Sequence, residues 1–170
     1  MNVDSAPARC AWATGNAAMA AYHDDEWGRP PGSDGGYLEA LTLEVFQAGL
    51  SWRTVLSKRE AFRRAFADFA LDAVAAYDDA DVVRLLADPG IVRHRGKIVA
   101  TIHNAAALRA IRDDHRSVHA WISAAPADPT ELYRTLRPHL AFFGPTTCES
   151  FLQAVGKLPA RHDPNCWRAR

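Results

Sequence analysis

The segment from Tyr37 to Leu50 restricts the possible folds of this chain more than any other. Its apolar residues follow helical spacing and surround the helical wheel almost completely. They are Leu38, Leu41, Leu43, Val45, Phe46 and Leu50. A helix that is apolar on nearly all sides must be buried, so the segment predicts a central helix. No segment alternates apolar and polar residues for long enough to indicate a sheet, and the fold class is therefore predicted to be all-α.

Glycine and proline divide the remaining chain into further helices. The dense cluster from Gly28 to Gly36 predicts a loop, and Asp88-Pro89-Gly90 predicts a second break. The apolar spacing predicts an amphipathic helix over residues 53–69 and a long helix from about Lys97 to Asp114. Shorter helices are expected over residues 71–77, 80–86, 118–123, 129–136 and 146–156. A chain of 170 residues without an internal repeat is expected to form one domain over residues 1–170.

Composition narrows the class of protein. The formal net charge is +0 and 48% of the residues are hydrophobic, which argues against wholesale disorder and limits any nucleic-acid surface to a local patch. No stretch approaches the roughly 20 apolar residues that span a bilayer, and the residues up to Ala13 lack an apolar core typical of a signal peptide. Three scattered cysteines do not form a disulfide framework. We expect a cytoplasmic monomer that is not associated with membranes.

Residues near both ends of the chain carry potential metal ligands. Cys10 and His23 lie near the N-terminus, and His162 and Cys166 form a His-x3-Cys pair near the C-terminus. Two thiolates and two imidazoles suit a tetrahedral zinc ion, and Pro164 favours a ligand-bearing turn. Four protein ligands leave no open position, so such a zinc would be structural. The alternative is a buried cysteine, a surface histidine and a solvated tail.

Glu44 is the strongest candidate for chemistry. It lies on the predicted buried helix between Leu43 and Val45. Burial of a carboxylate is costly unless the group is paired or has a function. The alternative interpretation is a salt bridge to one of the arginines.

Aromatic residues surround Glu44 in the sequence. Trp12, Tyr22, Trp27 and Trp52 lie near Cys10, His23 and Glu44, and flat rings beside a carboxylate form a pocket suited to a purine. Taken singly, each ring is better explained as part of the hydrophobic core. A zinc clamp at Cys10 and His23 would also position the neighbouring aromatic residues. The helix ends at Gly49, before Leu50, where a small residue permits close approach of a ligand or DNA strand.

A local basic patch lies in the second half of the chain. Residues 91–112 contain no acidic residue but include Arg93, Arg95, Lys97, Arg109 and Arg112. The turn Arg93-His94-Arg95-Gly96 opens directly onto a helix, whose free amides and positive end are suited to phosphate. The alternative is an ordinary turn with a solvated charged tip.

Several separated motifs resemble a known family. They are residues 9–12 (RCAW), 22–28 (YHDDEWG), 43–52 (LEVFQAGLSW), 91–98 (IVRHRGKI) and 143–147 (FGPTT). In this order and at comparable spacing they closely resemble the DNA-3-methyladenine glycosylase I family. The resemblance covers most of the chain.

The resemblance implies a helix-hairpin-helix glycosylase fold. It also implies an enzyme that flips the damaged nucleotide out of alkylated double-stranded DNA and excises 3-methyladenine. It implies one structural zinc at Cys10, His23, His162 and Cys166. It also implies that Glu44 and Tyr22 hydrogen-bond the excised base and that Trp52 stacks on it. The hairpin, with Arg93, His94, Arg95, Gly96 and Lys97, would grip the DNA backbone, and Gly49-Leu50 would lie against the gap left by the flipped nucleotide. Free 3-methyladenine and an abasic site would be the products.

The chain departs from the family pattern between Trp121 and Phe143. This segment is shorter than usual and lacks the expected lysine-rich stretch, which leaves a non-catalytic, zinc-stabilised DNA-binding module as a second hypothesis. A third hypothesis is a bifunctional lyase that uses Lys97 as a Schiff-base amine. No aspartate is placed convincingly after the hairpin to activate water, so Glu44 is predicted to recognise the base rather than to act as a general base.

Overall fold

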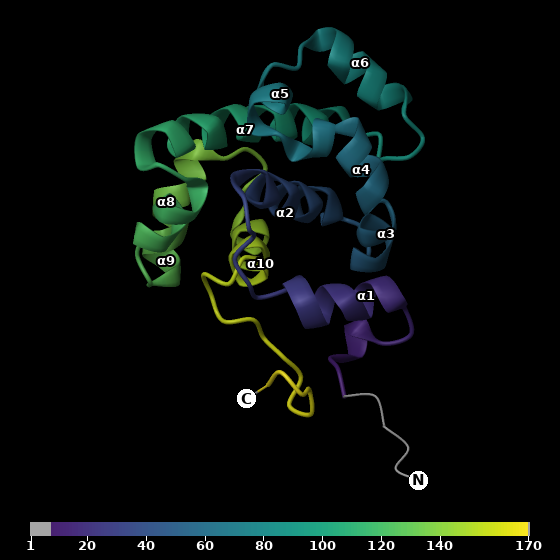
Figure 1. Ribbon diagram of the computed structural model, residues 1–170, viewed down its shortest axis with the longest axis vertical. Helices are drawn as coiled ribbons and strands as arrows, with labels where there is room; N and C mark the ends of the chain where they lie inside the picture. Colours follow the sequence, from purple (N-terminus) through teal and green to yellow (C-terminus); the bar gives the residue numbers. More distant parts are fainter. Residues whose placement is uncertain (1–7, 170) are drawn as a thin grey trace.

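The computed structural model describes residues 8–169, and this part of the chain contains helices but no strands (Figure 1). The all-α prediction is confirmed. None of its helices is long and apolar enough to cross a membrane. The helical elements are η1 (Ala11–Ala13), α1 (Ala17–Ala21), η2 (Tyr22–Glu26, a π-helix), α2 (Asp34–Gln47), α3 (Trp52–Ser57), α4 (Arg59–Ala65), η3 (Ala67–Phe69), α5 (Leu71–Ala75), α6 (Asp79–Ala87), α7 (Arg95–His115), α8 (Val118–Ala124), α9 (Pro129–Leu136), η4 (Arg137–His139) and α10 (Pro145–Ala154).

The predicted central helix is α2, which packs against α7, α10, α3 and α8. It begins earlier than expected, at Asp34, because the Ser33 hydroxyl caps it by accepting from the Gly36 amide at 3.1 Å. The prediction that Gly35 and Gly36 belong to the loop is therefore wrong. Gly35 is needed for packing, since a Cβ there would lie 2.9 Å from the Phe69 carbonyl oxygen.

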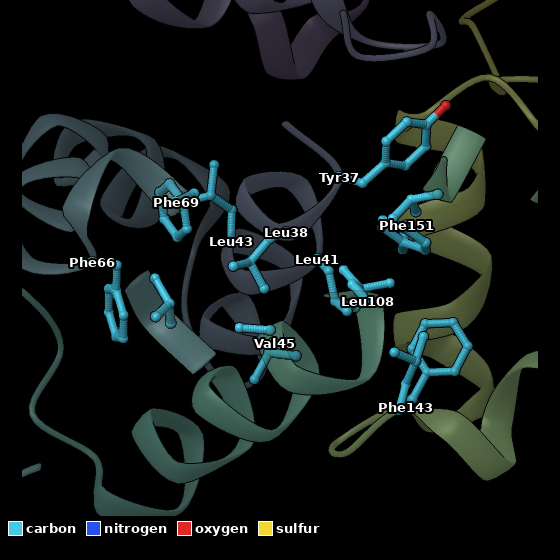
Figure 2. Close-up of a cluster of buried hydrophobic side chains, with 14 of the residues drawn as sticks. Tyr37, Leu38, Leu41, Leu43, Val45, Phe66, Phe69, Leu108, Phe143 and Phe151 are labelled. Atoms are coloured by element: carbon cyan, nitrogen blue, oxygen red, sulfur yellow. The ribbon is translucent and has the colours of Figure 1, made fainter. Parts of the chain in front are cut away.

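The main core surrounds α2. Figure 2 shows its leucines between aromatic side chains of two regions, Phe66 and Phe69 on one side and Phe143 and Phe151 on the other. All of these side chains are less than 5% exposed. The core therefore joins the first half of the chain to α10.

The long helix α7 extends the predicted segment at both ends. It begins at Arg95 because the His94 side chain caps it, accepting from the Lys97 amide at 3.2 Å. It ends at His115, and Arg116 then takes a left-handed conformation with φ of 71°. The five shorter helices lie within about two residues of their predicted positions.

The prediction of one helix over residues 53–69 is wrong. The structure divides this segment into α3, α4 and η3. Lys58 interrupts the first two helices with a ψ of 1°, and the three residues of η3 have positive φ angles. The apolar spacing persists through both breaks because the pieces pack on the same core.

The two ends of the described chain lie side by side at the lower end of Figure 1. The Trp167 amide donates to the Ala8 carbonyl at 2.8 Å, and the Gly28 amide donates to the Ala154 carbonyl at 2.9 Å. The short helices η1, α1 and η2 lie in a region for which the sequence predicted no helix. They bring the N-terminal residues beside α2 and α10.

Candidate functional site: a Cys2His2 centre beside an aromatic cavity

Cys10, His23, His162 and Cys166 converge where the chain ends meet. One potential ligand atom from each lies within 4.8 Å of all the others. The Cys10 sulfur is 3.5 Å from His162 Nδ1, and the Cys166 sulfur is 3.3 Å from His23 Nε2 and 3.6 Å from His162 Nδ1. Cys10, His23 and Cys166 are buried and His162 is half-buried. The predicted proximity of these residues is confirmed.

A carboxylate orients one of the imidazoles. Asp24 Oδ1 lies 2.8 Å from His23 Nδ1, so when that nitrogen carries the proton, Nε2 faces the Cys166 sulfur as a free electron pair. Asp24 in turn accepts from Arg9 at 2.8 Å and from the Trp167 indole at 3.3 Å. The hydrogen bond from Arg9 holds the pKa of Asp24 well below its usual range.

Backbone amides point at the sulfurs. The Asp163 amide lies 3.2 Å from the Cys10 sulfur, and the Arg168 amide lies 3.4 Å from the Cys166 sulfur. Burial raises the pKa of the Cys10 thiol, and the hydrogen bond from the Asp163 amide opposes this rise, which favours the thiolate that binds metal. The two sulfurs, two imidazole nitrogens and an orienting carboxylate fit a closed tetrahedral zinc site.

Aromatic rings continue from this centre into a cavity. The ring of Trp12 lies edge-on to His23 at 5.3 Å and to Trp27 at 5.1 Å, and Trp27 lies edge-on to His162 at 4.8 Å. The rings of Trp12 and Trp27 thus lie against imidazoles of the Cys/His cluster, and the expectation that a zinc clamp positions them stays a prediction.

The cavity has a volume of about 250 Å³. This is slightly below the roughly 300–1,000 Å³ typical of sites for larger small molecules, and it suits a single base. Its lining includes the five residues predicted from the sequence, Trp12, Tyr22, Trp27, Glu44 and Trp52. Three polar residues that the sequence analysis missed complete it: Gln47, Ser150 and Gln153.

Glu44 is 8% exposed. Within the described residues it forms no ion pair, so the salt-bridge interpretation is not supported. Burial alone raises the pKa of Glu44 from 4.5 to about 7. The cavity therefore contains a carboxylate whose negative charge is not compensated by the protein.

Tyr22 and Trp52 form the wall beside this carboxylate. Their ring centroids lie 5.1 Å apart at an angle of 51°. Burial, and then the proximity of Glu44, raises the pKa of Tyr22 far above its ordinary value, so the hydroxyl keeps its proton and can donate. The buried Trp52 Nε1 has no hydrogen-bond partner in the part of the chain that is described.

A larger cavity of about 370 Å³ lies on the other side of Tyr22 and Trp52. Arg59 there donates to both carboxylate oxygens of Glu26 at 2.8 and 2.6 Å and to Glu39 at 2.6 Å. Charged residues of both signs, including Asp25 and Arg29, line this larger cavity, whereas Glu44 is, among the described residues, the one charged residue in the lining of the smaller cavity.

The end of α2 leads from the smaller cavity to the surface. Gly49 has a φ of 84°, a left-handed conformation that favours glycine, and the Leu50 amide donates to the Gln47 carbonyl at 2.7 Å. Leu50, three residues after the cavity residue Gln47, is 39% exposed.

The hairpin segment, residues 90–97, presents Arg93, His94 and Arg95 to solvent. Lys97 does not face solvent, so its predicted place among the DNA-binding residues is wrong. It is 6% exposed, and its ammonium donates to the carbonyls of Phe46 and Ala48 at 3.1 and 2.7 Å. Its amide is also occupied by His94, so the prediction of uncapped amides at this helix end is wrong at this position.

The basic patch predicted over residues 91–112 is not a single charged surface. Arg112 lies in the last turns of α7 and pairs with Asp72 at 3.0 Å and with Asp113 at 2.9 Å. Arg93 and Arg95 lie in the hairpin segment itself, and the Arg95 guanidinium is 3.9 Å from the exposed Asp79 carboxylate. The basic residues predicted to form one patch are therefore divided between the hairpin segment and the last turns of α7.

This chain is similar to known proteins over most of its length. A family described as methyladenine glycosylase matches residues 12–135. The chain is 38% identical to DNA-3-methyladenine glycosylase 1 of Escherichia coli, covering 87% of this chain and 90% of that protein, and 33% identical to the Haemophilus influenzae DNA-3-methyladenine glycosylase, covering 87% and 91%.

Solved structures show the same fold. A crystal structure of 3-methyladenine DNA glycosylase I superimposes with a TM-score of 0.84 at 37% identity, covering 95% of this chain and 99% of that one. The Staphylococcus aureus enzyme, whose structure concerns the basis of 3-methyladenine recognition, superimposes with a TM-score of 0.83 at 31% identity, covering 95% and 96%. These matches, at 31% identity or more and over at least 95% of each chain, show that this chain has the same overall fold.

Proposed function

The chain belongs to the methyladenine glycosylase family, and from that premise we propose that it releases 3-methyladenine from alkylated DNA by hydrolysing the N-glycosidic bond. One observation carries the proposal: an unpaired carboxylate, Glu44, lies buried in an aromatic cavity of base size. Methylation at N3 gives adenine a positive charge, so the damaged base compensates the negative charge of Glu44. Normal adenine is neutral and cannot compensate this charge.

The cavity residues recognise the base rather than activate water. The Glu44 carboxylate accepts hydrogen bonds from the cationic purine, and the Tyr22 hydroxyl donates a hydrogen bond to it. The Trp52 ring stacks on the base, while Trp12 and Trp27 form the other side of the cavity. Methylation has already weakened the glycosidic bond. The protein therefore needs to hold the base strongly as it leaves the sugar, and little acid–base chemistry is required.

Double-stranded DNA is the proposed substrate, with the damaged nucleotide flipped out of the stack. Leu50, exposed at the turn that follows α2, enters the gap in the duplex. The hairpin segment forms part of a helix-hairpin-helix element, in which Arg93, Arg95 and the backbone near Gly96 contact phosphates. The protein acts as a monomer in the cytoplasm, where its cysteines remain reduced.

One zinc ion is proposed at Cys10, His23, His162 and Cys166. The donor set, the orienting Asp24 and the amides directed at the sulfurs support this assignment. When bound, the ion cross-links the N-terminal segment to the C-terminal loop and fixes the imidazoles on which Trp12 and Trp27 pack. With four protein ligands it takes no part in the hydrolysis.

The lyase hypothesis lacks support. The Lys97 ammonium is enclosed by two carbonyls and is not exposed in the cavity that contains Glu44. A Schiff base would require it to leave both partners.

Base release distinguishes the glycosylase from a DNA-binding module. The purified protein is incubated with methylated duplex DNA, and free 3-methyladenine is measured by chromatography. We expect release by the natural protein and at most about 1% of that rate from Glu44→Ala, if the carboxylate supplies the 2.7 kcal/mol or so that a buried charged hydrogen bond contributes. Zinc content and DNA affinity check that the variant folds. Failure of the natural protein to release base would refute the proposal.

A further inference from the structure

The three lysines of this chain share one structural role. Lysine occurs at positions 58, 97 and 157 only, and each ammonium donates to two backbone carbonyls. None of them forms an ion pair within residues 8–169. In this chain lysine therefore connects backbone segments, and arginine supplies the exposed cations near the hairpin.

Lys97 reaches from the hairpin to the cavity. It lies in the first turn of α7, and its ammonium closes the C-terminal end of α2 by donating to the Phe46 and Ala48 carbonyls. The negative end of the α2 dipole favours a cation there. Phe46 and Ala48 follow Glu44 by two and four residues, and Ala48 directly precedes Gly49. Lys97 thus links the phosphate-facing turn to the helix end that holds the cavity carboxylate.

Lys58 reaches in the opposite direction. It lies between α3 and α4, one turn and a half after Trp52, and donates to the carbonyls of Pro89 and Gly90 at 3.4 and 3.1 Å. Gly90 opens the hairpin segment. Lys58 therefore links the helix that carries Trp52 to the start of the hairpin.

We propose that Lys58 and Lys97 form a reciprocal brace that sets the distance between the DNA-gripping hairpin and the base cavity. Each lysine belongs to one of the two parts and holds the backbone of the other. The proposal rests on the proposed function, since it assigns both residues as positioning residues for excision. Neither residue lines the cavity that contains Glu44.

A fixed distance matters because the flipped nucleotide is held at two points. The hairpin holds the phosphate backbone while the cavity holds the base, and the sugar between them must present its reacting carbon to water. A displacement of about 1 Å at such a site costs on the order of 100-fold in rate. Binding of DNA alone, or of the free base alone, makes no such demand.

The test replaces each ammonium with an apolar group of similar length, in Lys58→Met and Lys97→Met. Lys157→Met is the matched control, because Lys157 closes the end of α8 by donating to the Ser123 and Ala125 carbonyls at 3.1 and 2.7 Å, away from the hairpin and the cavity. Three quantities are measured: the single-turnover rate of base release from methylated duplex, the affinity for that duplex, and the affinity for free 3-methyladenine from quenching of the cavity tryptophans.

We expect the release rate to fall about 10- to 100-fold in both brace variants while the free-base affinity stays at the natural value. Lys157→Met should keep the natural rate even if it lowers the unfolding temperature equally. Lys58→Arg should restore much of the rate, since a guanidinium can donate to the same half-exposed carbonyls. If Lys97→Met does not fold, the comparison of Lys58→Met with Lys58→Arg, at a half-buried position, tests the brace by itself.

Three results would overturn the brace. The rates of the brace variants could equal that of Lys157→Met, their free-base affinity could fall in step with the rate, or Lys58→Arg could fail to restore what Lys58→Met loses. In each case the natural protein still releases base and the proposed function stands. Absence of release from the natural protein refutes the proposed function itself, and the brace with it.

Discussion

Replacement of Glu44 by glutamine should increase the stability of the protein relative to that of the natural protein, and this difference should grow as the pH rises. The perturbation removes a buried carboxyl group whose pKa is raised from 4.5 to about 7 by burial. Between these two values the folded protein binds a proton that the unfolded chain releases, so ionisation of Glu44 costs stability as the pH rises through the folded pKa. Above the folded pKa the cost is constant.

The magnitude follows from the size of the shift. A shift from 4.5 to about 7 corresponds to a full penalty of about 3 kcal/mol, of which about 2 kcal/mol develops between roughly pH 5.5 and pH 8.5. Glutamine has a similar shape and does not ionise. The stability of Glu44→Gln relative to the natural protein should therefore increase by about 2 kcal/mol over this interval.

Urea denaturation of both proteins at the two pH values measures this change. Contributions of all other groups are common to both proteins and cancel in their difference, provided that zinc content is matched. A difference in stability that does not vary with pH, or a variant that is less stable than the natural protein at about pH 8.5, would refute the assignment of Glu44 as an uncompensated buried carboxylate.

The remaining predictions concern the metal, the turn and the hairpin. Metal analysis should find one zinc per chain. Its removal by a chelator should lower the unfolding temperature and also weaken 3-methyladenine binding, because Trp12 and Trp27 pack on the imidazoles of His23 and His162. If metal-free protein kept both its unfolding temperature and its affinity for the base, the proposed zinc cross-link would be contradicted. Leu50→Ala should slow release from duplex DNA several-fold while free-base affinity is unchanged, and equal slowing on single-stranded DNA would show that the side chain does not fill a gap. Arg93→Ala and Arg95→Ala should each reduce the slope of log affinity against log salt by about 1, with little dependence on the lesion, and an unchanged slope would place the phosphates elsewhere.

The amino-acid pattern predicted the parts of the fold that depend on burial. The central helix and the position of Glu44 on it follow from apolar residues on all sides of one segment, and the structure confirms both. The break at Lys58 could not be predicted in this way, because the apolar spacing of α3 and α4 is continuous across it. The backbone angles of Lys58, which end α3, are seen only in the structure.

The site was predictable where its residues are close in sequence or belong to motifs. Trp12, Tyr22 and Trp27 neighbour the potential metal ligands Cys10 and His23 in the sequence, whereas Ser150 and Gln153 reach the cavity only through the packing of α10. Their three-residue spacing is an ordinary helical pattern. Lys97 shows the opposite error: its basic neighbours indicated a phosphate contact, but a sequence gives no direction for a side chain, and the carbonyls at the end of α2 hold it inside.

A crystal structure of the protein with 3-methyladenine tests the central claim most directly. The base should occupy the cavity of about 250 Å³, stacked on Trp52, with its exocyclic amino group within hydrogen-bond distance of the Glu44 carboxylate. A base bound instead in the larger cavity beside Arg59, or bound without contact to Glu44, would contradict the account.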